Sequence, residues 1–165
     1  MARRTRTYVA FDADSDIRYY RLMQAWKAND GFEFDFNNAH DLTTIRPDSG
    51  EAAIKASLRE RMKNSNCLVV LVGENTKYLR KYVPWEVEIA MKADLPLIVV
   101  NINGKKQMDN NLCPTLLHSA LAIHIPYGPD IMQLALDNWP TSHLKNRMGK
   151  SSGPFYYNQS VYDGL

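Results

Sequence analysis

The residues with the clearest potential for chemistry lie in segment 82–90, which reads YVPWEVEIA. Pro84 suits the first turn of a helix, where its missing N–H group is not needed, and Glu86 follows two residues later. One apolar run, Cys67–Val72, precedes this segment and a second, Leu95–Ile102, follows it. Ligands of open α/β sheets bind beyond the carboxyl ends of the strands, so a carboxylate between two buried strands is well placed. Glu86 is therefore the strongest catalytic candidate.

Helical spacing separates Glu86 from the second glutamate of this segment. Glu86 shares one helix face with Ile89 and Ala90, whereas Glu88 has i, i+4 spacing to Lys92 on an exposed face. This phase predicts that Glu86 points toward the sheet and Glu88 toward solvent. In the alternative interpretation, Glu86 only complements the helix dipole, an effect worth about 0.3–1 kcal/mol.

The other candidates are aromatic, acidic and amide side chains near the same predicted sheet edge. Aromatic rings there could stack on a planar ligand or serve as core residues. The predicted substrate-binding residues are Phe11, Asp12, Asp14, Asn38, Tyr82 and Trp85.

The acid pair Asp12 and Asp14 has further interpretations. It could cap the helix that follows, or it could hold a metal ion as in a phospho-accepting receiver domain. A receiver domain needs an aspartate at the end of its third strand, where this chain has Gly73 and Glu74. The four histidines and two cysteines also lack the close spacing of zinc ligands. No metal site is predicted.

Several common nucleotide and hydrolase motifs are missing from the sequence. It contains no Gly-x-Gly-x-x-Gly after the first strand, no Walker loop and no Gly-x-Ser-x-Gly elbow. A net charge of +2 is too small to indicate nucleic-acid binding. Two cysteines are too few for a disulfide framework.

Alternating apolar runs and helical patterns predict a three-layer α/β fold. We expect a five-stranded parallel sheet of flavodoxin-like order 2-1-3-4-5, with the last helix over 130–139 closed by Pro140. Residues 1–145 are predicted to form this domain, and residues 146–165 a loose tail. The expected strands are Thr7–Phe11, Phe32–Phe36, Cys67–Val72, Leu97–Val100 and Leu121–Ile125.

The hydropathy of the sequence bears on membrane insertion, export and cellular location. No apolar run reaches the length of a transmembrane helix, and no apolar segment follows the arginines at the N-terminus. We therefore expect no membrane insertion, no export and a cytoplasmic location.

Three segments together resemble a known family. They are residues 8–12, residues 65–76 with the pattern V-x-L-x-G-x-x-T, and residues 82–90 with the pattern V-x-W-E-x-x-x-A. In this order they resemble the TIR-like domain family of the bacterial Thoeris anti-phage defence protein ThsB, over about residues 5–125.

The resemblance implies an enzyme that cleaves the nicotinamide–ribose bond of NAD, with Glu86 as the catalytic glutamate. NAD is then a substrate, and no cofactor is needed. The product, a cyclic ADP-ribose isomer or an ADP-ribose conjugate, would act as a second messenger on a separate effector. The resemblance also implies self-association for activity. Phe11 and Asp12 would edge the pocket, and Tyr82 would stand where many TIR domains have tryptophan.

Three other functions stay open at this point. The chain could be a TIR-like interaction module without catalysis, which would have no need for an inward carboxylate at Glu86. It could be a receiver-like or nucleotide-binding protein, or it could be a nucleoside transferase-like enzyme that also breaks a glycosidic bond.

Overall fold

The computed structural model describes residues 5–29, 34–38 and 50–165 and contains a six-stranded, all-parallel sheet of order β2-β1-β3-β4-β5-β6. The strands are β1 Thr5–Ala10, β2 Phe34–Asn38, β3 Cys67–Val72, β4 Leu97–Asn101, β5 Ala122–Pro126 and β6 Pro154–Tyr156. The helices are α1 Ala13–Asn29, α2 Glu51–Met62, α3 Tyr82–Lys92, α4 Pro129–Met148 and α5 Gln159–Asp163, with short 3₁₀ turns η2 Thr76–Tyr78 and η3 Thr115–Leu117.

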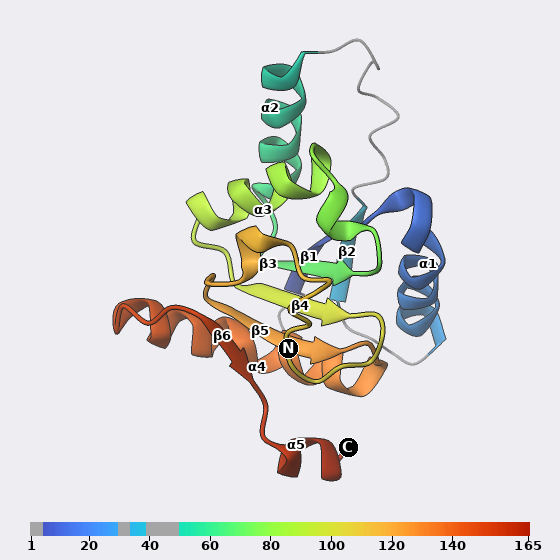
Figure 1. Ribbon diagram of the computed structural model, residues 1–165, viewed down its shortest axis with the longest axis vertical. Helices are drawn as coiled ribbons and strands as arrows, with labels where there is room; N and C mark the ends of the chain where they lie inside the picture. Colours follow the sequence, from blue (N-terminus) through green and yellow to red (C-terminus); the bar gives the residue numbers. More distant parts are fainter. Residues whose placement is uncertain (1–4, 30–33, 39–49) are drawn as a thin grey trace.

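Helices cover both faces of the sheet, as Figure 1 shows. Every residue of β3 and of β4 is buried, which explains why these strands read as continuous apolar runs. Alternate side chains of β3 enter two separate cores: Val69 and Leu71 pack with α1 and α4, and Leu68 and Val70 pack with α2 and α3. The three-layer α/β fold is confirmed.

The predicted order of the first five strands is confirmed, and the sequence of the predicted tail adds a sixth strand. Residues 154–156 pair with β5 in parallel register, His124 opposite Tyr156. Phe155 packs against Trp139 of α4, with ring centroids 5.5 Å apart. The expectation of a loose tail was wrong for these residues because an aromatic side chain fixes the strand to the domain.

The last helix is longer than predicted. It continues through Pro140 to Met148, so proline does not end it. Proline has a helix-compatible φ and removes one backbone hydrogen bond, which makes an interior position costly rather than forbidden. Beyond Pro140 the buried His143 Nε2 atom lies 3.0 Å from the carbonyl oxygen of Asp94, which holds the second half of the helix on the domain.

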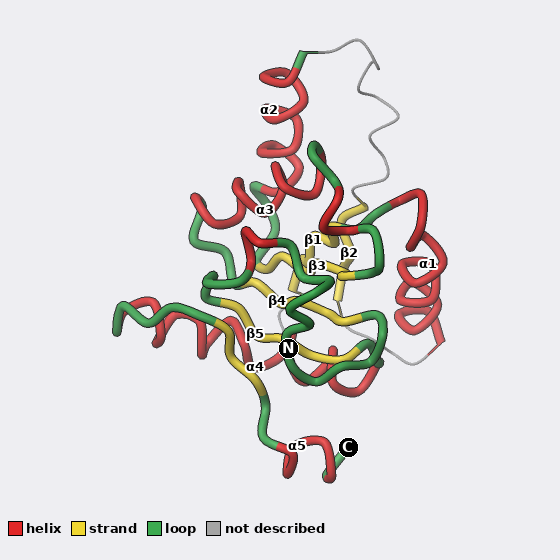
Figure 2. Tube along the Cα trace, in the orientation of Figure 1, coloured by secondary structure: helices red, strands yellow, loops and turns green. Residues whose placement is uncertain are grey.

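The carboxyl ends of the parallel strands open onto the loops that Figure 2 draws in green. At this edge the end of β1 lies beside the end of β3, with Ala10 in register with Val70. In the described part of the chain, no helix is long and apolar enough to cross a membrane.

Candidate active site

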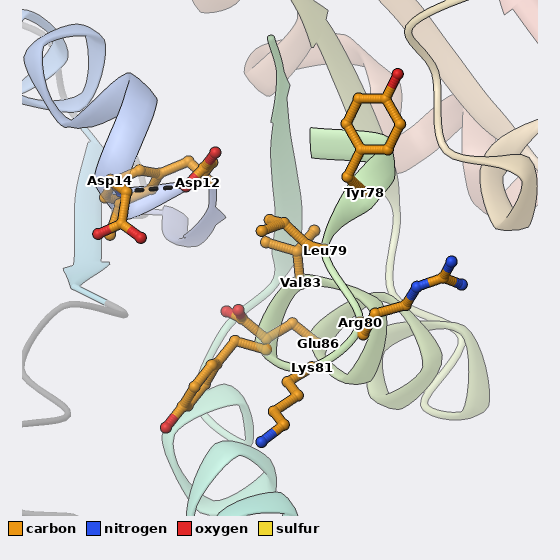
Figure 3. Close-up of a pocket in the computed structure, with 11 residues that line it drawn as sticks. Asp12, Asp14, Tyr78, Leu79, Arg80, Lys81, Val83 and Glu86 are labelled. Atoms are coloured by element: carbon orange, nitrogen blue, oxygen red, sulfur yellow. Dashed lines mark hydrogen bonds between the residues drawn. The ribbon is translucent and has the colours of Figure 1, made fainter. Parts of the chain in front are cut away.

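A cavity of about 550 Å³ opens between the start of α1 and the start of α3. Its size suits a small-molecule ligand, for which pockets of roughly 300–1,000 Å³ are usual. Figure 3 shows Asp12 and Asp14 on one side of it and Glu86 on the other. The lining residues are Phe11, Asp12, Ala13, Asp14, Tyr78, Leu79, Arg80, Lys81, Tyr82, Val83 and Glu86.

Glu86 is buried at the wall of this cavity, with 2% of its surface exposed. Val83, Val87 and Ala90 of the same helix are also buried, whereas Glu88 is exposed. The predicted phase of the two glutamates is therefore confirmed. The expected ion pair between Glu88 and Lys92 does not form in the described structure.

The environment of Glu86 favours its neutral form. Burial raises the pKa of this carboxyl group to about 8, and the nearby Tyr8 hydroxyl offsets part of the rise. Glu86 Oε2 and Tyr8 Oη are both buried, and neither has a partner of good hydrogen-bonding geometry among the described residues. A buried carboxyl group at the wall of a cavity, with its pKa raised, is a candidate for contact with a ligand.

The acidic side of the cavity comes from the β1–α1 connection. Asp12 is buried and caps α1: its Oδ1 atom accepts a hydrogen bond from the Asp14 N–H at 3.1 Å, and its carbonyl accepts one from the Asp16 N–H. The helix-cap interpretation of Asp12 is thus confirmed, and the same residue also lines the cavity. Asp14 is exposed at the cavity wall. Phe11 lies beside them and stacks on Tyr20 with ring centroids 4.8 Å apart.

Next to this site, Asp16 of α1 lies against the backbone of Gly73, the residue that follows β3. A Cβ atom added to Gly73 would collide with the carboxyl group of the buried Asp16, so a larger residue at this position would have to displace that carboxyl group. Burial raises the pKa of Asp16, and the neighbouring Asp12 raises it further. Asp16 itself faces a smaller neighbouring hollow rather than the cavity of Glu86.

The two predicted aromatic residues of α3 lie in different places. Tyr82 lines the cavity and is 40% exposed. Trp85 instead lines a second groove, of about 670 Å³, between α2 and α3. The ammonium group of Lys55 sits 5.3 Å from the centre of the Trp85 ring, and the Tyr82 and Trp85 rings are 5.9 Å apart. The structure does not place Trp85 in the cavity.

The remaining predicted residue, Asn38, ends β2, and its side chain lies outside what the structure describes. Tyr8, whose hydroxyl acts on Glu86, was not predicted as a site residue because its alternation in β1 is that of any core residue. The cationic pair Arg80 and Lys81, which precedes α3 and lines the cavity, was not predicted either.

Within the described ranges, no three His, Cys, Asp or Glu side chains are grouped as metal ligands would be. Both cysteines are buried and free, and burial raises the pKa of Cys113 to about 12, which makes it a poor nucleophile.

Comparison with known proteins places the chain in a family. Residues 8–107 match the family described as Thoeris protein ThsB, TIR-like domain. No curated protein matches the chain. The family match covers more than half of the sequence. It runs from within β1 to beyond β4 and includes the residues that line the cavity, Glu86 among them. This chain therefore belongs to the TIR-like domain family of the Thoeris protein ThsB.

Proposed function

We propose that this protein cleaves the nicotinamide–ribose bond of NAD and that Glu86 is the catalytic residue. One observation carries the proposal: a buried carboxyl group lines a cavity of suitable size at the carboxyl ends of the strands. Family membership supports NAD as the substrate and a role in defence against phage. The product would be a second messenger, either a cyclic ADP-ribose isomer or an ADP-ribose conjugate, that acts on a separate effector.

The chemistry needs stabilisation of positive charge and no protein nucleophile. The bond between the pyridinium nitrogen and the anomeric carbon breaks, and its electron pair leaves with neutral nicotinamide. The ribose is left as an oxocarbenium cation, which a carboxylate at the cavity wall stabilises. Water, or a nitrogen or oxygen of another acceptor, then bonds to the anomeric carbon and releases a proton.

The raised pKa of Glu86 fits this reaction through the charge of the substrate. In the empty cavity the carboxyl group is mostly protonated at pH 7. A bound pyridinium ring places a positive charge near it and favours the carboxylate. The catalytic charge is thus strongest when the cationic substrate is present. Asp12 and Asp14 add negative charge to the opposite wall.

The two glutamates of α3 supply a matched experiment. Glu86→Gln removes the charge from the cavity, while Glu88→Gln makes the same change on the exposed face of the same helix. We expect Glu86→Gln to release nicotinamide from NAD at least about 100-fold more slowly, a typical loss for one electrostatic contact to a transition state. Glu88→Gln should match the unaltered protein. Equal rates in all three proteins, measured by chromatography, would contradict the assignment.

The assembly and the partners are further proposals that rest on the family. We propose that protomers self-associate for activity. Sedimentation at increasing protein concentration, followed by NAD turnover in the same samples, tests whether activity rises with assembly.

A further inference from the structure

Tyr8 lies directly under the segment of α3 that carries Glu86. It is a fully buried residue of β1, and its ring belongs to the same core as Val83 and Val87 of α3. These two valines come three residues before and one residue after Glu86. Helix α3 packs on β1, and the Tyr8 hydroxyl interacts with the Glu86 carboxyl group across this contact.

The Tyr8 hydroxyl and the Glu86 carboxyl group each change the pKa of the other. Burial and the Glu86 carboxyl group both raise the pKa of Tyr8, and interaction with the Tyr8 hydroxyl lowers the pKa of Glu86. These opposite directions are those of a hydroxyl that keeps its proton and favours an ionised carboxylate. Tyr8 Oη and Glu86 Oε2 both lack a partner of good geometry among the described residues, so the hydroxyl is free to donate and the carboxylate oxygen is free to accept.

We propose that Tyr8 is a positioning residue, whose hydroxyl donates a hydrogen bond to the Glu86 carboxylate and holds that carboxylate toward the cavity. The role in catalysis rests on the proposed function, whereas the pairing itself does not. A hydroxyl that donates to a carboxylate holds that carboxylate in one orientation. A charged group that is already oriented stabilises a transition state without having to reorganise during the reaction. A tyrosine that served only as a core aromatic would have no use for its oxygen in this place.

The described charged groups that face or act on the pair can be separated from it experimentally. Asp12 and Asp14 face Glu86 from α1, across the cavity, and Arg80 and Lys81 line the cavity just before α3. From α2, Arg61 acts on Tyr8 and lowers its pKa. None of these residues changes when only the Tyr8 hydroxyl is removed.

The test compares Tyr8→Phe with Tyr157→Phe, which removes a buried hydroxyl from the segment after β6, remote from the cavity. Glutamate side chains labelled with ¹³C at the carboxyl carbon are titrated by NMR, and the Glu86 signal is identified by its loss in Glu86→Gln. We expect the Glu86 midpoint to rise in Tyr8→Phe, so that the ionised fraction at pH 7 falls about tenfold. Tyr157→Phe should leave the midpoint unchanged. An unchanged midpoint in Tyr8→Phe would overturn the pairing.

Turnover of NAD gives the catalytic half of the test. In Tyr8→Phe, kcat/KM at pH 7 should fall about tenfold and should recover as the pH is raised above the new midpoint. A loss that is equal at every pH would show that Tyr8 is structural. If the unaltered protein does not cleave NAD but the NMR midpoint moves, the proposed function fails and the pairing stands.

A second measurement keeps the phenol oxygen and exchanges only one ring hydrogen for fluorine, in case Tyr8→Phe does not fold. Incorporation of 3-fluorotyrosine lowers the pKa of the phenol and strengthens it as a donor. The Glu86 midpoint should then fall in the otherwise unaltered protein. A midpoint that stays constant after this replacement would also overturn the proposal.

Discussion

Glu86→Gln should make the folded protein more stable at alkaline pH, and the size of this effect follows from burial. Glutamine has nearly the shape of glutamate and no charge. The pKa of Glu86 rises from 4.5, the ordinary value, to about 8 in the folded protein because the carboxyl group is desolvated. Below pH 4.5 the group is neutral in the folded and unfolded chains, so the two proteins should differ little.

Between pH 4.5 and pH 8 the unfolded chain releases the Glu86 proton while the folded protein keeps it. The free energy of unfolding therefore falls as the pH rises through this window. A pKa that moves from 4.5 to about 8 corresponds to about 5 kcal/mol, since each pH unit contributes about 1.4 kcal/mol. The glutamine variant lacks this loss. Its advantage over the unaltered protein should grow by about 5 kcal/mol between pH 4 and pH 9.

Calorimetry at pH 4 and pH 9, at one ionic strength, measures this difference. For a chain of this size each kcal/mol changes Tm by about 2–4 °C, so the difference in Tm between the variants should grow by about 10–20 °C. Glu88→Gln, on the exposed face of α3, should show almost no growth. If the advantage of Glu86→Gln is the same at both pH values, Glu86 ionises as it would in water, and the inference from burial is wrong.

Three further predictions concern Glu86, the contact between Gly73 and Asp16, and the buried His124 of β5. For NAD cleavage, kcat/KM should rise about tenfold per pH unit and level off near pH 8, where Glu86 ionises in the empty cavity; a flat profile from pH 6 to pH 9 would contradict this. Gly73→Ala should lower the free energy of unfolding in urea by about 1–3 kcal/mol, because its Cβ would meet the Asp16 carboxyl group, and Asp16→Ala should recover part of that loss. Burial lowers the pKa of His124 to about 4, so stability should fall by up to about 3 kcal/mol as the pH drops from 6.5 to 4, and His124→Gln should remove this dependence in urea unfolding.

Much of this fold could be predicted because its central strands leave a strong signal. Strands such as β3, buried on both faces, read as unbroken apolar runs, and the helices between them enforce parallel pairing. The phase of Glu86 was equally accessible, since two residues along a helix, about 200° of rotation, separate an inward position from an outward one. Strand β4 is also buried along its whole length, and it was predicted by the same rule.

The errors have a common physical origin in contacts between segments distant in the sequence. The strand at residues 154–156 has only three residues, and nothing local to it shows that Phe155 will find Trp139. Trp85 follows the helix phase that faces α2, and only the placement of α2 decides that this phase meets a groove rather than the cavity. The contact of the Tyr8 hydroxyl with Glu86 could not be predicted for the same reason, because strand alternation indicates that a residue is buried but not which residues it contacts.

Helix α3 is a wall shared by two cavities. Glu86 faces one of them and its neighbour Trp85 the other, and the rings of Tyr82 and Trp85 contact each other over the boundary. Consecutive residues of a helix are separated by about 100° of rotation, so the helix cannot turn one of these side chains without turning the other by the same angle. A rotation of α3 about its axis would therefore change the shape of the Glu86 cavity and the shape of the groove against α2 at the same time.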